Sequence, residues 1–200
     1  MNVLSDYARA ELTVKNSRFI AEVFPVTTQA QAREKLHAVK ASYADATHVV
    51  HAFITGLQAE TCGMSDDGEP SGTAGRPVLD VLKGSGITNI LLTVTRYFGG
   101  TLLGTGGLVH AYSDSACAVL AACRSEPYIE KKHFMLTLDY ALYEVIKRRA
   151  EAFHISDITE EYSSDVSVAG TVWASEADAF ASAVKDASKG KTEVILEPCT

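Results

Sequence analysis

The amino-acid sequence predicts an α+β protein of two domains. Strand-like runs of β-branched and aromatic residues alternate with helix-like runs whose apolar residues recur every three or four positions. The turn-rich segment Ser125-Glu126-Pro127 separates two sets of such runs. The chain has 200 residues, of which 46% are hydrophobic, and this suits one large domain or two small ones. We therefore expect one domain at residues 1–125 and a second at residues 126–200.

The first domain is expected to open with a hairpin whose strands cover residues 11–14 and 17–26. Thr28 then begins a helix, with Gln31 three residues later in a capping-box pattern. The buried face of that helix carries Ala32, Leu36, Val39 and Tyr43. The elements expected after it are a strand at 47–54, a loop at 61–75, a short helix at 77–83, a buried strand at 89–95, a glycine-rich loop at 97–107 and a long helix at 108–123.

The second domain is expected to follow the order β-α-β-β-α-β. Its predicted strands lie at 128–138, 156–162, 166–174 and 192–197, and its predicted helices at 142–153 and 175–190. Ser175 is expected to cap the second of these helices, and Gly190 to end it. Because this is the order of a split βαβ domain, we predict a ferredoxin-like fold for residues 126–200.

Charge and cysteine usage narrow the classes of function. The net charge is −7, and an acidic chain attracts polyanions poorly, which argues against tight non-specific nucleic-acid binding. The four cysteines form no C-x-x-C pair and have no zinc spacing. Residues 1–10 lack the apolar core of a signal peptide, and the longest apolar run, residues 87–94, is too short to cross a bilayer. We therefore expect a cytoplasmic protein with free thiols and no membrane contact.

A stretch rich in Gly, Ser and Thr, residues 65–77, offers the three carboxylates of Asp66, Asp67 and Glu69 just before a helix. Carboxylates can ligate Mg²⁺ or Ca²⁺, or act as general acids and bases. Aspartate and serine in such a loop can equally bond to the local backbone and have no further role. The spacing is not that of an EF-hand loop, and neither a metal site nor a cofactor is predicted.

A second stretch, from Arg96 to Leu108, holds five glycines before the long helix. Bare amides at a helix N-terminus attract anions, so this stretch is a candidate phosphate or anion site. It is neither a P-loop nor a G-x-G-x-x-G fingerprint, and glycine can also serve only tight turns and close packing. Tyr97 and Phe98 are interpreted as core anchors, with base stacking as the alternative.

We expect these two loops to lie side by side and to form one surface, because both leave the sheet just before a helix. Arg96 carries the charge opposite to the three carboxylates, and a partly exposed pair with one of them would contribute ~1 kcal/mol. Paired glycine-rich loops can also buttress each other and bind nothing, and this alternative stays open.

Two long stretches carry a family resemblance. The first reads Asp66-Asp67-Gly68-Glu69-Pro70-Ser71-Gly72-Thr73-Ala74-Gly75. The second begins Arg96-Tyr97-Phe98-Gly99-Gly100 and continues to Gly104-Thr105-Gly106-Gly107-Leu108. Both look like the signature of the IMPACT family, which includes the bacterial YigZ-like proteins, and residues 15–21 and 46–48 match it as well. The later part resembles the small C-terminal domain of the bacterial two-domain members, so the resemblance covers essentially the whole chain.

The resemblance implies a ribosomal protein S5 domain 2-like fold for the first domain and a ferredoxin-like fold for the second. This pair is similar in architecture to two consecutive domains of elongation factor G. Eukaryotic members regulate translation by binding a regulator of an initiation-factor kinase, so the family suggests contacts with a translation-related protein or RNA. Leu102 and His110 stand where relatives usually carry cations, which weakens any phosphate contact at this place.

Two functions follow from these observations. The first is a non-catalytic binding or regulatory protein linked to translation, with no catalytic residue assigned. The alternative is an enzyme that acts on a phosphorylated small molecule, with the glycine-rich loop as its cradle and the loop carboxylates as bases or Mg²⁺ ligands. The lack of a phosphate-binding lysine in the glycine-rich loop favours the first. The candidate binding residues are Asp66, Asp67, Glu69, Ser71, Thr73, Arg76, Arg96, Tyr97, Gly99, Gly100, Gly104, Gly106 and Gly107.

Overall fold

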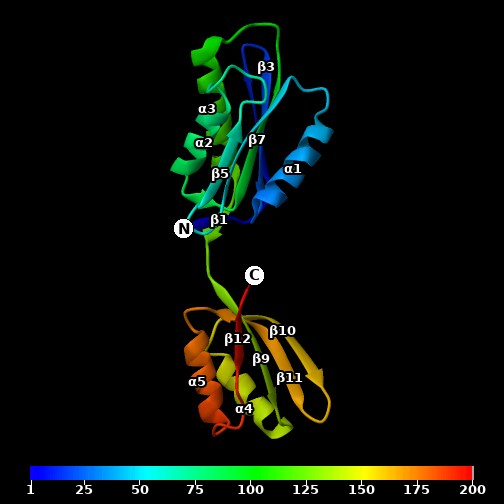
Figure 1. The fold of residues 1–200 in the computed structure, drawn as a ribbon, viewed down its shortest axis with the longest axis vertical. Coiled ribbons are helices and arrows are strands. Elements are labelled where there is room, and N and C mark those ends of the chain that lie inside the picture. The colour runs from blue at the N-terminus through cyan, green and yellow to red at the C-terminus, as the bar shows by residue number, and fades with distance from the viewer. Residues whose placement is uncertain (200) are drawn as a thin grey trace. The chain divides into compact units, whose positions relative to one another are not determined.

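The computed structural model describes residues 1–199 and divides into two compact units, which meet in the sequence between Tyr128 and Ile129 (Figure 1). Both units combine helices with sheets, so the predicted α+β class is confirmed. Strand β8 (Ser125–Pro127) pairs with β1 (Asn2–Leu4) in the first unit. Residues 126–128 therefore lie in the first unit rather than at the start of the second.

The first unit is built on a five-stranded antiparallel sheet of order β2-β3-β7-β4-β5. Its strands are β2 (Ala8–Val14), β3 (Ser17–Pro25), β7 (Ile90–Tyr97), β4 (His48–Thr55) and β5 (Thr61–Ser65). A smaller sheet joins β1 to β8 and to β6 (Ile87–Thr88). The expected loop at 61–75 is thus wrong over its first five residues, because residues 61–65 pair with β4 as an edge strand.

Helices cover both faces of the five-stranded sheet (Figure 1). Helix α1 (Gln29–Ser42) packs on one face, over a core of Val26, Ala32, Phe53 and Leu91. It begins as predicted, with the Thr28 hydroxyl accepting from the Gln31 amide at 3.2 Å. Helices α2 (Gly75–Gly84) and α3 (Gly104–Ala122) lie over the other face and cover the larger core.

Helix α3 begins four residues earlier than the sequence predicts. The glycine-rich loop therefore covers only residues 98–103, between β7 and α3, and Gly104, Gly106 and Gly107 belong to the first turn of the helix. Glycine lowers helix propensity, which is why the pattern placed the start at Leu108. The sequence places an apolar stripe on this helix at Leu108, Tyr112, Ala116, Val119 and Cys123. The first four are buried, and Cys123, at the C-cap, is only partly buried.

The second unit is a four-stranded antiparallel sheet of order β10-β11-β9-β12, with both of its helices on one face (Figure 1). Along the chain its elements are β9 (Lys131–Leu138), α4 (Tyr140–Ala150), β10 (Ile155–Tyr162), β11 (Val166–Trp173), α5 (Ala177–Ala187) and β12 (Ile195–Pro198). The expected cap at Ser175 is wrong, because α5 begins one residue later, after Glu176, and no side chain caps it. Among residues 1–199, no helix has both the length and the apolar character that a membrane span requires.

Candidate functional site

The two predicted loops are joined by a buried ion pair between Glu69, which follows β5, and Arg96, at the end of β7. The Arg96 Nη1 atom lies 2.6 Å from Glu69 Oε1, and the two side chains are only 6% and 3% exposed. Tyr112 of α3 donates to the same Oε1 atom at 2.7 Å. The guanidinium also lies 5.5 Å from the ring centres of Phe19 and Phe98. The predicted pairing of Arg96 with a loop carboxylate is therefore found, with Glu69 as the partner.

Burial changes the energetics of this pair. The sequence suggested a partly exposed pair, but here both charges have left water, so loss of one partner would strand the other and cost about 3–5 kcal/mol. Burial, followed by the neighbouring Glu69 carboxylate, raises the pKa of Tyr112 far above its usual value. Tyr112 therefore serves as a fixed hydrogen-bond donor to Glu69 at ordinary pH.

The Asp66 carboxylate closes its own loop over the start of α2. It accepts hydrogen bonds from the backbone amides of Gly72 at 2.9 Å, Ala74 at 3.1 Å and Gly75 at 2.7 Å. Burial raises the pKa of Asp66, but these three backbone hydrogen bonds outweigh it and leave the pKa below its usual value. The side chain acts as a helix cap supplied from eight residues upstream of Ala74, and its oxygens are committed to the protein itself.

Asp67 ties the same loop to α1 and β4. Its carboxylate pairs with the Lys40 ammonium and accepts from the Val49 amide at 2.7 Å. Its backbone carbonyl lies 2.8 Å from the His48 Nδ1 atom. Burial raises the pKa of Asp67, but the Lys40 and Val49 hydrogen bonds lower it by more, so the carboxylate stays ionised at neutral pH.

The remaining candidates of the first loop separate into buried and exposed residues. Thr73 is buried and donates to the Pro70 carbonyl at 2.6 Å, which is a local turn contact. Ser71 is exposed. Arg76 is exposed as well and pairs with Asp80 one helical turn later at 2.9 Å, so it takes no part in the buried network.

The second loop rests against the β2–β3 turn. The Gly99 amide donates to the Ser17 hydroxyl at 3.2 Å, and a Cβ atom at Gly99 would lie 2.0 Å from the backbone of Asn16. Only glycine fits such an approach, and Gly100, with a φ of +81°, completes the turn. Tyr97 is partly exposed and donates to Asp45 at 2.9 Å.

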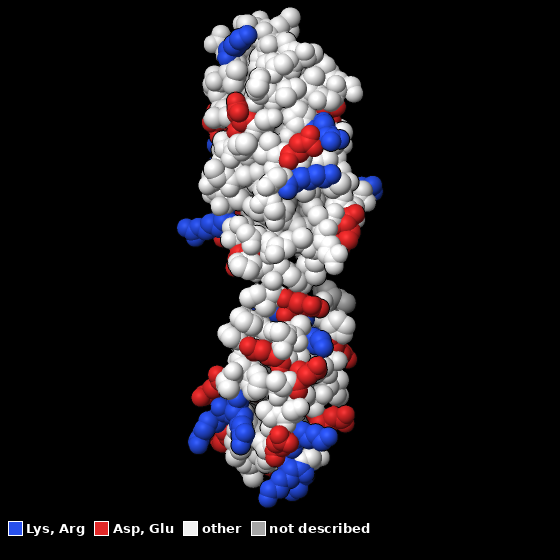
Figure 2. All heavy atoms as spheres, turned by 90° about the vertical axis from the view of Figure 1, so that its left-hand side faces the viewer, with Lys and Arg blue, Asp and Glu red and all other residues white. Residues whose placement is uncertain are grey.

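Large apolar side chains stand exposed at the tip of this loop. Phe98 is 46% exposed, which contradicts its interpretation as a core anchor, and Leu102 is 83% exposed. Figure 2 shows Lys, Arg, Asp and Glu side chains more densely on the second unit than on the side of the first unit that faces the viewer, where several are also visible. The sequence has the same unequal density of charge, with 22 charged residues among the last 75 positions and 21 among the first 125.

The two histidines of β4 lie on opposite faces of the sheet. His48 faces Glu69, with 3.9 Å between Nε2 and Oε2. His51 is turned toward the α1 face, where burial, followed by the nearby Lys40, lowers its pKa. Within residues 1–199, no group of three or more His, Cys, Asp and Glu side chains is arranged to hold a metal ion.

Sequence reasoning missed two members of this network, Tyr112 and Lys40. Tyr112 sits on a stripe that reads as plain core, and the available signal was its hydroxyl, since a buried tyrosine usually needs a partner. Lys40 lies on the polar side of α1, where nothing in the sequence distinguishes it from a solvated lysine. Together these contacts form a scaffold in which Asp66, Asp67 and Glu69 are bonded to other groups of the protein. The exposed tip of the second loop, formed by Phe98 and Leu102, is apolar.

Comparisons with known proteins agree with the predicted family. Residues 15–120 match the profile described as "Impact N-terminal domain", and residues 136–191 match "Domain of unknown function (DUF1949)". The chain is 32% identical to an IMPACT family member of Haemophilus influenzae, over 93% of this chain and 91% of the relative. It is 33% identical to IMPACT family member YvyE of Bacillus subtilis, over 92% and 85%. It is also 32% identical to YigZ of Escherichia coli, over 91% and 90%.

Solved structures extend the likeness to the fold. A crystal structure described as that of a hypothetical protein aligns over all of this chain and 97% of its own, with a TM-score of 0.70 and 29% identity. A structure of the two-domain translational regulator Yih1 is 26% identical over 61% of this chain and 47% of its own, but its TM-score of 0.37 is too low to support an inference. On the two profile matches and the three relatives, the chain belongs to the IMPACT family.

Proposed function

We propose that this protein is a non-catalytic regulatory protein that acts on translation in the cytoplasm by binding a partner protein. The contact is assigned to the loop surface, meaning the exposed residues of segments 66–74 and 98–103. The link to translation comes from the family resemblance. The choice of surface comes from the structure of the first unit.

The observation that carries the proposal is the contrast between the carboxylates and the loop tip. Asp66, Asp67 and Glu69 each bond to groups of the protein, so metal ligation or acid–base chemistry would require breaking those bonds. Phe98 and Leu102, in contrast, present large apolar side chains on a segment held by the buried network. Apolar and aromatic side chains in a rigid frame are typical anchors of protein interfaces.

A protein partner is favoured over RNA. Binding to a phosphate backbone needs cations, and segments 66–74 and 98–103 contain no lysine or arginine. Arg76, the cation nearest in sequence to the first loop, is already paired with Asp80. An enzyme acting on a phosphorylated small molecule would likewise find no lysine or arginine within these two segments.

We also infer the fold type of each unit. A ferredoxin-like fold for the second unit is supported by the strand order β10-β11-β9-β12 with both helices on one face. A ribosomal protein S5 domain 2-like fold for the first unit is supported by the family resemblance and by the β-sheet that carries helices on both faces.

The test is capture of translation components by the tagged full chain from an extract of bacteria that are actively translating. We expect the double variant Phe98→Ala, Leu102→Ala to lose capture, while its melting temperature stays within a few degrees, because both side chains are substantially exposed. Leu57→Ala, an exposed leucine outside the two loops, is the matched control.

Three outcomes decide between the functions. Capture retained by the double variant would show that the loop surface is not the contact. Capture abolished by ribonuclease would move the proposal from protein to RNA. Reproducible hydrolysis of a phosphorylated metabolite that disappears in Asp67→Asn would replace the regulatory function with the enzymatic one.

A further inference from the structure

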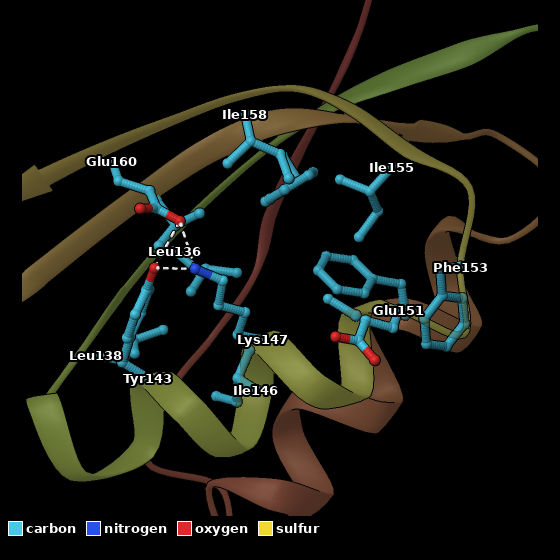
Figure 3. Close-up of a pocket in the computed structure, with 14 residues that line it drawn as sticks. Leu136, Leu138, Tyr143, Ile146, Lys147, Glu151, Phe153, Ile155, Ile158 and Glu160 are labelled. Atoms are coloured by element: carbon cyan, nitrogen blue, oxygen red, sulfur yellow. Dashed lines mark hydrogen bonds and ion pairs between the residues drawn. The ribbon is translucent and has the colours of Figure 1, made fainter.

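The second unit contains an apolar pocket between α4 and the strands it covers (Figure 3). Its volume is about 250 Å³. A cavity of ~150 Å³ already holds benzene, so this pocket admits an aromatic ring with a short chain. Its apolar walls come from the sheet and both helices, and they are formed by Phe134, Leu136, Leu138, Ile146, Ile155 and Val168, with Phe153, Ile158 and Phe180.

A bulge in the edge strand β10 contributes to this pocket. The pairing of β10 with β11 shifts between Ser156 and Thr159, and Asp157 adopts a φ of +56°. Two residues of β10 thus oppose Gly170 alone, which bends the edge strand. In Figure 3 the side chains of Ile155 and Ile158 point from β10 toward α4, and Ile158 remains 54% exposed. The pocket is therefore open to solvent on one side.

The charged groups around the pocket do not cancel. The Lys147 ammonium lies 3.0 Å from the Tyr143 hydroxyl and 3.9 Å from Glu160, and Tyr143 donates to Glu160 at 2.7 Å (Figure 3). These three groups satisfy one another. Glu151, one turn after Lys147, also lines the pocket from an exposed position, and no hydrogen bond or ion pair within residues 1–199 involves its carboxylate.

The lining therefore carries one lysine and two glutamates, a net charge of −1. The two arginines near Glu151 in sequence, Arg148 and Arg149, line a different groove on α4 together with Glu144. A ligand complementary to this pocket has a compact apolar body and a single positive charge at one end. We propose that the second unit binds a small aromatic or branched aliphatic amine, with its apolar body between α4 and β10 and its ammonium on Glu151.

The test uses three probes of one shape: 2-phenylethylamine, 2-phenylethanol and 3-phenylpropionate. Each is titrated into the full chain with ¹³C-labelled Ile, Leu and Val methyl groups, observed by NMR. We expect saturable shifts confined to the methyl groups that line the pocket, with the tightest binding for the amine and the weakest for the acid. An ion pair that is partly exposed predicts an advantage of about two- to five-fold for the amine over the alcohol.

Two variants separate the parts of the proposal. Glu151→Gln should remove the advantage of the amine and leave binding of the alcohol unchanged. Glu144→Gln, the same change on the other side of α4, should leave both affinities unchanged. The absence of saturable shifts with all three probes would overturn the site. Equal affinities for amine and acid, or an amine advantage that survives Glu151→Gln, would overturn the assignment of the ligand class.

Discussion

At the scale of single residues, the first-unit site is a set of polar side chains that bond to one another. The sequence predicted that Arg96 would meet a loop carboxylate, because the opposite charges lie on loops expected to be neighbours. It left open which of three carboxylates that would be, because the choice depends on the path of the backbone. It also missed the Tyr112 hydroxyl, because the spacing of a helix gives burial but not the groups that lie opposite.

The buried pair predicts a large effect of Arg96→Met. The change strands the Glu69 charge, so the free energy of unfolding in urea should fall by about 3–5 kcal/mol. Adding Glu69→Gln should recover part of the loss, because no buried charge then remains unpaired. Arg76→Met removes an exposed pair and should cost less than about 0.5 kcal/mol. Equal losses of unfolding free energy for Arg96→Met and Arg76→Met would contradict the role of the buried ion pair.

The Asp66 cap predicts a pH-dependent effect. The pKa of Asp66 is lowered in the folded protein, so its stabilisation is present above the pKa of the unfolded chain and is lost as the pH falls through the folded value. Asp66→Ala should therefore cost about 1 kcal/mol at pH 7 and progressively less below pH ~4. Urea unfolding as a function of pH measures this. Asp80→Ala is the control, and a loss for Asp66→Ala that does not change with pH would contradict the cap.

At the scale of elements, the strongly patterned segments were predicted well. The capping box gave the start of α1, and the apolar stripe gave the buried face of α3. The misplaced elements lack such patterns. Strand β5 contains a glycine, has no run of β-branched residues and pairs only with β4 at the sheet edge. The first turn of α3 is glycine-rich and begins without a side-chain cap. In both cases tertiary contacts, which a local pattern does not contain, outweigh intrinsic propensity.

Two glycines of the same stretch should respond in opposite ways to alanine. Gly99→Ala places a Cβ 2.0 Å from the Asn16 backbone, so loop and turn must separate, and we expect a loss of about 1–3 kcal/mol. Gly106 lies inside α3 with open space beside it, so Gly106→Ala should raise stability by about 0.5–1 kcal/mol. Thermal unfolding of the two variants tests this, and a stabilising Gly99→Ala would refute the contact.

At the scale of the whole molecule, the sequence indicated two domains from the restart of the strand and helix pattern. It could not show that β8 returns to pair with β1, because the partners are more than 120 residues apart and the strand is only three residues long. That pairing places the three residues after the expected boundary in the first unit.

We predict that residues 1–128 and 129–200 each fold when expressed alone, because each unit has its own hydrophobic core. Residues 1–124 should be less stable than 1–128, because they lack β8 and leave one edge of β1 unpaired. The dispersion of ¹H–¹⁵N NMR spectra and the midpoint of thermal unfolding measure both expectations. A disordered 129–200 fragment would show that its core is insufficient without the first unit.

The buried network of Glu69, Arg96 and Tyr112 has a consequence for how the sequences of such proteins diverge. A substitution at one of these residues leaves the others without a partner, so we expect substitutions there to be rare and to occur together. Phe98 and Leu102 at the loop tip are exposed and are not constrained in this way. Descendants of one ancestor can thus keep the two signature stretches and still exchange partners. Leu102, whose side chain is 83% exposed, is an example of a position without this constraint. Two proteins with the same motifs can therefore share the buried network and still differ in the exposed side chains at the loop tip.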